Sequence, residues 1–86
     1  MEKTFELIPI YDRKSFYGKA KVTENNGKAT LYSYNTPVAS ITMNDKKFHR
    51  LWAGYSATTM RHVNSFLRHY DVEGGGKKWW CEQKVE

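Results

Sequence analysis

Cysteine is nearly absent from the sequence: Cys81 stands alone, so no internal disulfide can form. Secreted domains of this size usually depend on such crosslinks because their cores are small. The residues after Met1 lack the apolar run of a signal peptide, and no stretch approaches the roughly 20 residues that span a bilayer. We therefore expect a protein of the cytoplasm that has no membrane segment.

Proline is also sparse, with two residues, and no internal repeat is present. Hydrophobic residues make up 40% of the chain and charged residues 27%, which is typical of a globular protein rather than a disordered one. A chain of 86 residues is long enough for one domain and too short for two. We expect residues 1–86 to form a single domain.

Lysine and arginine outnumber the acidic residues, which gives a net charge of +5 and a pI near 9.4. Such a balance favours polyanionic partners, because it raises association rates and adds affinity that does not depend on sequence. The aromatic content is high, with four Phe, six Tyr and three Trp. Aromatic side chains that are not buried in the core provide good contact surface for a partner.

The strongest local signal is the pair Asn26 and Gly27, which tolerates the positive φ angles of a type I′ turn. A hairpin closed by these two residues fixes the register of its strands. We expect four facing pairs: Val22 with Leu31 and Ala20 with Ser33 on the inner side, and Lys21 with Tyr32 and Lys19 with Tyr34 on the outer side.

Three further segments have the pattern of strands. Residues 4–10 predict a first strand that joins at an edge, with Pro9 either restricting it to an edge position or ending it. Residues 38–43 predict the arm after the turn at Pro37, and residues 48–52 predict the last strand. Together with the hairpin they predict an antiparallel meander.

A helix is expected at about residues 56–70, where Ser56 is a good N-cap. Its apolar stripe at helical spacing consists of Met60, Val63, Phe66, Leu67 and Tyr70. The opposite row consists of Arg61, Ser65 and Arg68, with His62 and His69 beside it. The predicted fold class is α+β, an antiparallel sheet of three to five strands with one amphipathic helix packed on one face. The segment from Lys77 to Trp80 forms either a short final strand or a tail docked by its tryptophans.

Three groups of side chains are candidates for partner binding. Cations that alternate with aromatic rings on a sheet are suited to binding a nucleic acid. Arginines one or two turns apart on a helix can bind phosphates or carboxylates. Tryptophan is enriched at protein interfaces. The ordinary alternative for each group is a solvated surface or a core contact. The candidates are Lys19, Lys21, Tyr32 and Tyr34 on the hairpin, Arg61 and Arg68 on the helix, and Lys77, Lys78 and Trp79 in the tail.

Enzymatic chemistry is not predicted. The serines, histidines and acids have no spacing that indicates a triad or a carboxylate pair. No CxxC or HxxxH pair marks a metal site, and the three glycines that begin at Gly74 lack the spacing of a phosphate-binding loop. We expect no catalytic residues, no metal and no cofactor.

Three segments, which begin at Tyr11, Gly54 and Glu73, read YDRKSFYG, GYSATTMRH and EGGGKKWW; a fourth, LYSYNTP, begins at Leu31. The set resembles short proteins of no assigned activity that are carried by phages and integrative elements of Firmicutes. The resemblance implies an accessory gene of a mobile element and assigns no functional residue.

Two hypotheses of function follow from that resemblance and from the charge. The leading one is a protein that binds and inhibits a defence nuclease or nucleoprotein of the host cell, of the anti-CRISPR type. The alternative is a small basic DNA- or RNA-binding accessory or regulatory protein, whose affinity would fall steeply with salt. A structural role in the machinery of the element is a third hypothesis. The oligomeric state, including a homodimer, stays open.

Overall fold

The computed structural model describes residues 2–7 and 19–86. The strands are β1 (Lys3–Glu6), β2 (Ala20–Asn25), β3 (Lys28–Ser33), β4 (Thr36–Thr42) and β5 (Lys47–Arg50), and the helices are α1 (Ala57–His69) and α2 (Lys77–Glu82). The end of the predicted first strand, the connection after it and the start of the hairpin fall in residues 8–18, outside the described residues.

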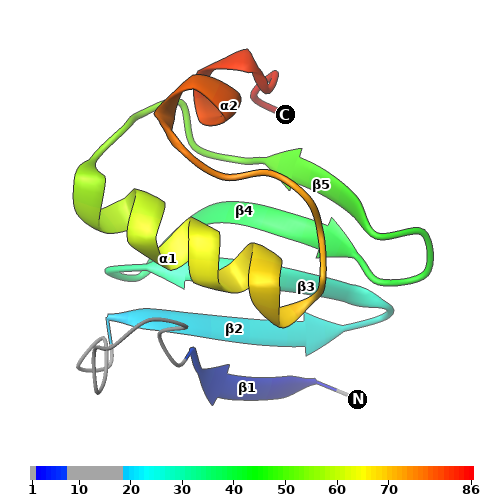
Figure 1. Cartoon of the computed structure of the whole chain (residues 1–86). Helices are drawn as coiled ribbons and strands as arrows, with labels where there is room; N and C mark the ends of the chain where they lie inside the picture. Colours follow the sequence, from blue (N-terminus) through cyan, green and yellow to red (C-terminus); the bar gives the residue numbers. More distant parts are fainter. Residues whose placement is uncertain (1, 8–18) are drawn as a thin grey trace.

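The five strands form one sheet in the order β1-β2-β3-β4-β5, and each strand pairs antiparallel with the next. Figure 1 shows this meander with α1 running across it. The predicted α+β class, the number of strands and the edge position of the first strand are confirmed.

The hairpin of β2 and β3 has the predicted turn, with φ of 55° at Asn26 and 77° at Gly27. Both angles are positive, as a type I′ turn requires. The facing pairs Ala20 with Ser33, Val22 with Leu31 and Lys21 with Tyr32 are as expected.

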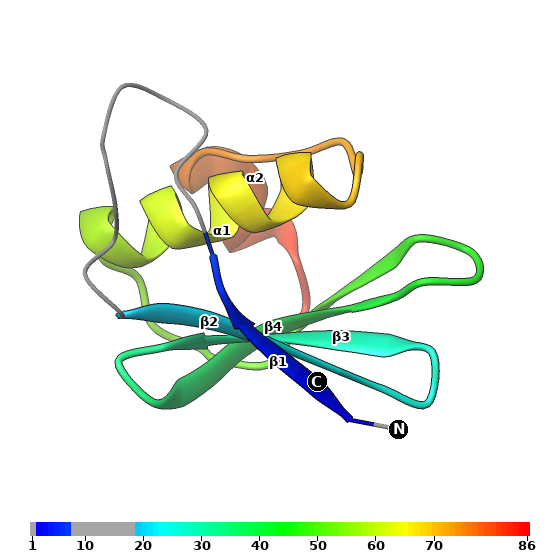
Figure 2. The same ribbon diagram turned by 90° about the horizontal axis from the view of Figure 1, so that it is seen from below.

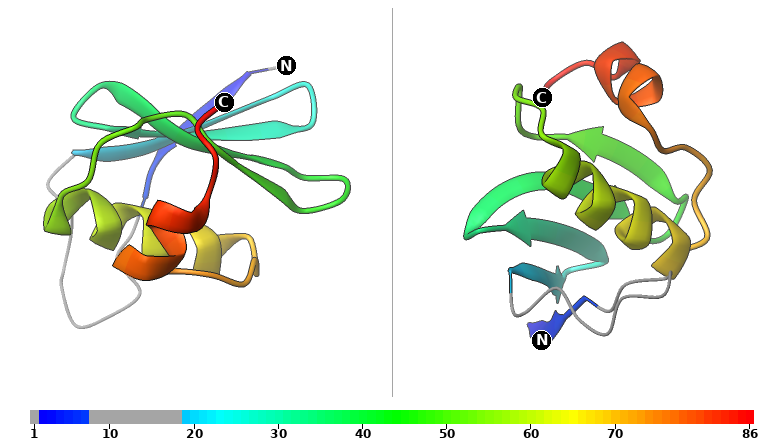
Figure 3. Two further views of the ribbon diagram at one scale, coloured as in Figure 1. Left: turned by 90° about the horizontal axis from the view of Figure 1, so that it is seen from above. Right: turned by 60° about the vertical axis from the view of Figure 1, so that its left-hand side comes forward.

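Both helices lie on the same side of the sheet (Figures 2 and 3). The core lies between the sheet and α1, and its fully buried members include Val22, Leu31, Ile41, Phe66 and Trp80. Neither helix covers the opposite side, which we call the open face: Thr4, Glu6, Lys21, Thr23, Asn25, Lys28, Thr30, Tyr32, Pro37, Ser40, Thr42, Lys47 and His49. None of the helices in the described part of the chain is long and apolar enough to cross a membrane.

Helix α1 begins where the sequence predicts, because the Ser56 side chain accepts a hydrogen bond from the Thr59 backbone N–H at 3.0 Å. Met60, Val63, Phe66 and Leu67 are buried in the core as expected. Tyr70, half-buried, donates a hydrogen bond to Glu24 of β2, which ties the end of the helix to the sheet.

The expected outer row of α1 is partly wrong. Arg61 and Arg68 are exposed, but Ser65 is 2% exposed and His62 is 1% exposed. The reason is that α1 is buried over a wider arc than its apolar stripe, since Thr59, His62 and Ser65 are buried as well. Polar side chains at the edge of the stripe are therefore inside.

The first alternative for the tail, a final strand, is wrong, because Lys77–Glu82 forms the short helix α2. The second, a tail docked by its tryptophans, is confirmed by the full burial of Trp80. In a strand Trp79 and Trp80 would point to opposite faces. The helix brings both rings to the same neighbour, with their centres 4.7 Å and 6.3 Å from that of Phe48. Trp80 is fully buried and Trp79 is half-buried, so one ring completes the core and the other covers its edge.

Candidate functional site

A groove of about 340 Å³ opens where the β3–β4 turn meets the N-terminal end of α1. Pockets of this size that combine apolar walls with a few polar groups are the usual form of a ligand site. We call it the tyrosine groove; its lining consists of Ser33, Tyr34, Thr36, Val38, Trp52, Tyr55, Ser56 and Thr59.

Two exposed tyrosines line the groove, Tyr34 with 51% and Tyr55 with 43% of its surface accessible. Each ring has a lysine beside it. The Nζ atom of Lys19 lies 5.5 Å from the centre of the Tyr34 ring, and that of Lys77 lies 5.2 Å from the centre of the Tyr55 ring. In each pair the ammonium lies over one face of an exposed ring, and cations combined with exposed aromatic rings are typical of surfaces that bind single-stranded nucleic acids.

Buried hydroxyl groups form the inner end of the groove. Ser33 is 3% exposed and Thr59 is 5% exposed, and their hydroxyl oxygens lie 3.3 Å apart. The Ser33 hydroxyl also lies 2.8 Å from Nδ1 of the buried His62. Burial, together with the nearby Lys19 charge, lowers the pKa of His62 from 6.5 to about 4. The imidazole is therefore neutral at physiological pH, and the Ser33 contact is a hydrogen bond between uncharged groups.

Arg50 fixes the loop that carries Trp52 and Tyr55. Its guanidinium, on a residue only 7% exposed, donates five hydrogen bonds to backbone carbonyls. The acceptors are the oxygens of Trp52 at 2.9 Å, Ala53 at 2.9 Å, Gly54 at 3.3 Å, Trp80 at 3.0 Å and Gln83 at 3.2 Å. A buried cation is tolerated when its donors are satisfied in this way.

Gly54 shapes the same wall of the groove. A Cβ atom at this position would lie 2.4 Å from Cζ2 of Trp52, so the indole packs directly on the glycine. The Gly54 carbonyl also accepts a hydrogen bond from Nε1 of Trp80 at 2.8 Å. The position of Trp52 thus depends on a residue with no side chain.

The structure divides the predicted hairpin group. Lys21 and Tyr32 face each other on the open face, but Lys19 and Tyr34 lie at the tyrosine groove. The strand alternation ends at Tyr34, where φ is 51°, and its ring centre lies 5.8 Å from that of His62 in α1. The expectation that all four side chains share one surface is wrong for this reason.

The remaining predicted residues are scattered over the helices. Lys77 joins the groove through Tyr55, whereas Lys78 is exposed on α2 and Trp79 packs on Phe48. Arg61 is exposed near the start of α1. Arg68 lines a smaller hollow of about 190 Å³ with Asn64 and residues 74–76.

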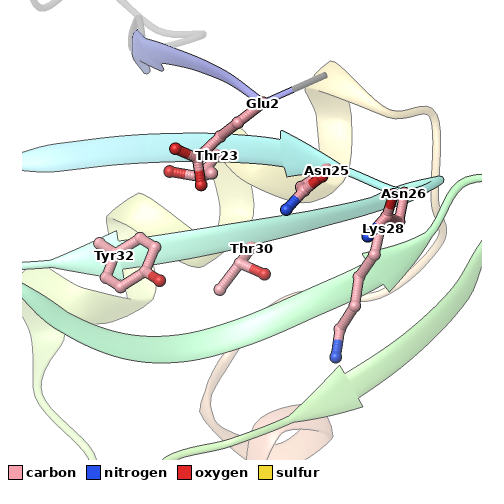
Figure 4. A pocket seen from close by; sticks show the side chains of 7 residues that line it. All are labelled: Glu2, Thr23, Asn25, Asn26, Lys28, Thr30 and Tyr32. Carbon is pink, nitrogen blue, oxygen red and sulfur yellow. The ribbon is translucent and has the colours of Figure 1, made fainter.

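The open face carries a second hollow, of about 350 Å³, shown in Figure 4. Its lining is polar and includes both charge signs: Glu2, Thr23, Asn25, Asn26, Lys28, Thr30 and Tyr32. The side chains stand on β2, β3, the turn between them and Glu2, which directly precedes β1. The mixture of one carboxylate and one amine gives this hollow no net charge to attract a polyanion.

The open face also holds an acid–histidine–hydroxyl chain that sequence spacing did not reveal. His49 Nδ1 lies 2.6 Å from Oε2 of Glu86, and its Nε2 lies 3.0 Å from the Thr42 hydroxyl. The Glu86 N–H donates to the Arg50 carbonyl at 2.7 Å. These contacts fasten Glu86 to β5.

Metal-binding groups are not assembled in the described residues: no three His, Cys, Asp or Glu side chains there are placed to hold an ion. Cys81 is exposed and free.

Sequence reasoning missed Ser33, Trp52, Tyr55, Thr59 and His62 as a group. One signal was present, since Ser33 is a polar residue on the predicted inner side of the hairpin and Tyr55 directly precedes the N-cap of α1. The contacts among them join residues 26 and 29 positions apart.

Comparisons with known proteins place the chain in a family. The model of a family of unknown function, DUF8033, matches residues 5–82. No curated protein and no solved structure matches the chain. Because the family model covers most of the sequence, the chain belongs to the DUF8033 family of unknown function.

Proposed function

We propose that this protein works by binding single-stranded nucleic acid in the tyrosine groove. The observation that carries the proposal is the pairing of each exposed groove tyrosine with a lysine, Tyr34 with Lys19 and Tyr55 with Lys77. Aromatic side chains stack on bases of any sequence, and the neighbouring cations bind the phosphates between them.

The net charge of +5 supports this ligand class, because counterion release drives binding to a strand of phosphates. The groove supports a single strand in particular. Bases that are paired and stacked in a duplex cannot offer a face to the tyrosine rings, whereas unpaired bases can. The open face has one lysine–tyrosine pair, Lys21 with Tyr32, and its hollow is lined by one aromatic side chain and carries no net charge.

The test is fluorescence anisotropy with labelled 12-nucleotide DNA and RNA strands at several salt concentrations. The double variant Lys19→Ala/Lys77→Ala removes two cations at the groove, and Lys28→Ala/Lys47→Ala removes two exposed lysines from the open face. For single strands, removing two phosphate contacts should lower the slope of log K against log salt by about 1.4. We expect this change in the groove variant and a smaller one in the control. An equal change of this slope in both variants would indicate diffuse electrostatic attraction to the whole surface and contradict a site at the groove.

Inhibition of a host defence nuclease stays a prediction. The guide RNA of such a nucleoprotein belongs to the ligand class proposed here, so inhibition would act through the same groove. Loss of inhibition in Lys19→Ala/Lys77→Ala, with retention in the open-face control, would connect the two activities.

A further inference from the structure

The inner end of the tyrosine groove is polar, although most of a core this small is apolar. Ser33 and Thr59 are almost completely buried, while Tyr34 and Tyr55 at the same groove are exposed. The hydroxyl pair therefore lies deep and the rings lie at the mouth. Burying hydroxyl groups costs free energy unless they are hydrogen-bonded. Two buried hydroxyls at the inner end of a groove therefore indicate a place where a ligand can form hydrogen bonds.

The hydroxyl pair keeps hydrogen-bonding capacity. Each hydroxyl offers one donor and two acceptor positions. Ser33 uses two of its three, with His62 and Thr59, and the Thr59 hydroxyl uses one, with Ser33, among the described residues. When Thr59 donates to Ser33 it can accept from a ligand that enters the groove, and when Ser33 donates to Thr59 the Thr59 hydroxyl can donate to the ligand.

We propose that the tyrosine groove is a nucleobase site, in which one unstacked base lies against the tyrosines and its polar edge hydrogen-bonds with Ser33 and Thr59. This inference rests on the proposed function for its ligand class. It adds a preference among bases, because binding through charge alone would have the same affinity for every base. Ser33 and Thr59 are the specificity-determining residues. His62 is a positioning residue, because its 2.8 Å contact orients the Ser33 hydroxyl.

The chemistry of the lining fits a base better than a simple anion. A simple anion would accept hydrogen bonds from the lysines and the hydroxyls but would make no use of the flat tyrosine rings. A base presents a flat ring to the tyrosines and donors and acceptors along its edge. A nucleotide bound in this way places its phosphate at the mouth, on the side of Lys19 or Lys77.

The experiment titrates the whole protein with the four ribonucleoside 5′-monophosphates, one at a time, and follows the backbone amide resonances. We expect perturbations at Ser33, Tyr34, Tyr55 and Thr59. We also expect dissociation constants that differ by about tenfold between the best and the worst base, which corresponds to about 1.4 kcal/mol.

Ser33→Ala and Thr59→Val each remove one groove hydroxyl. In both variants the ratio between the dissociation constants of the worst and the best base should fall from about tenfold to about threefold or less. This change corresponds to a loss of about half of the free energy that separates the two bases. Ser65→Ala is the matched control, because Ser65 is equally buried on α1 but does not line the groove. It should keep the preference of the unaltered protein. Thermal unfolding of each variant separates loss of preference from loss of the fold.

The outcomes distinguish this inference from the function on which it rests. If oligonucleotides bind but all four monophosphates bind equally, or if Ser33→Ala and Thr59→Val keep the preference, the nucleobase site is wrong and strand binding stands. If monophosphates bind in the groove with a preference but strands do not bind, strand binding is wrong and the base site stands. If neither binds, both are wrong.

Discussion

The guanidinium of Arg50 lies 4.4 Å from the centre of the Trp80 ring, so the last strand is joined to α2 by a cation stacked on an indole. The same guanidinium donates to backbone carbonyls of the loop at residues 52–54. One side chain therefore holds together β5, α2 and the loop that carries Tyr55 to the tyrosine groove.

Removing this side chain should strongly destabilise the protein. Arg50→Ala removes five hydrogen bonds to the loop and α2 together with the stacking on Trp80, and we expect it to lower the free energy of unfolding by about 3–5 kcal/mol. Arg50→Lys should recover little, because an ammonium cannot reproduce the planar fork of donors. Urea unfolding measures both. Arg61→Ala, an exposed control on α1, should change the free energy by about 0.5 kcal/mol or less. Equal effects of the Arg50 and Arg61 variants would contradict this role.

The buried His62 should make stability fall in mild acid. The unfolded chain takes up a proton at His62 near pH 6.5, whereas the folded protein resists protonation until about pH 4, because burial lowers the pKa of this group. The folded state then binds fewer protons than the unfolded state between these two values. The free energy of unfolding should therefore fall as the pH is lowered from about 6.5 to 4, by up to about 3 kcal/mol.

The measurement is urea unfolding at pH 7.5 and pH 4.5, with His62→Gln as the reference. The variant has no titrating group at this position, so its loss of stability between the two pH values should be smaller. The same loss in both proteins would assign the acid sensitivity to other groups.

Gly54→Ala should disturb the groove through Trp52. The added methyl group would meet the indole at 2.4 Å, and relief of such a clash by a shift of side chain or backbone typically costs about 1–3 kcal/mol. Oligonucleotide affinity should fall as well, because Trp52 lines the groove. Gly27→Ala provides the comparison: φ is 77° there and no atom lies within 4 Å. It should reduce stability through strain alone and leave affinity unchanged in the folded protein.

Ser40→Ala should not destabilise the protein, unlike the substitutions above. The Ser40 hydroxyl is buried and has no hydrogen-bond partner among the described residues, so Ser40→Ala removes an uncompensated polar group. We expect no loss of stability, or a gain of about 1 kcal/mol. Ser33→Ala, which breaks contacts with His62 and Thr59, should instead cost about 1–2 kcal/mol. Calorimetric melting compares the two serines, and a larger loss at Ser40 would contradict the hydrogen-bond assignment.

Most of the fold could be predicted because its signals are local. The turn at Asn26 and Gly27 sets the register of β2 and β3, and Ser56 with the apolar stripe behind it sets α1. The helix α2 could not be predicted from its own residues. Its six residues are too few to form a stable helix alone, and the burial of Trp80 against Arg50 and Gly54 stabilises it.

The candidate site could be predicted only in part. Charge and aromatic pattern predict Lys19, Tyr34 and Lys77 as candidates. The positive φ of Tyr34 brings its ring to the groove, away from Tyr32, and Lys77 joins the groove through Tyr55. Tyr34 is a residue type that seldom adopts this conformation. The contacts of Ser33 with His62 and of His49 with Glu86 join residues 29 and 37 positions apart, and no sequence spacing encodes such pairs.

The most direct test of the tyrosine groove removes its rings. Tyr34→Ala/Tyr55→Ala should weaken binding of a 12-nucleotide single strand by about 2–6 kcal/mol, because each stacked base contributes about 1–3 kcal/mol. Tyr32→Ala, on the open face, should leave the affinity of the folded protein within about twofold, close to 0.4 kcal/mol. If the Tyr32 variant loses as much affinity as the double variant, or if the double variant binds as the unaltered protein does, the tyrosine groove is not the binding site.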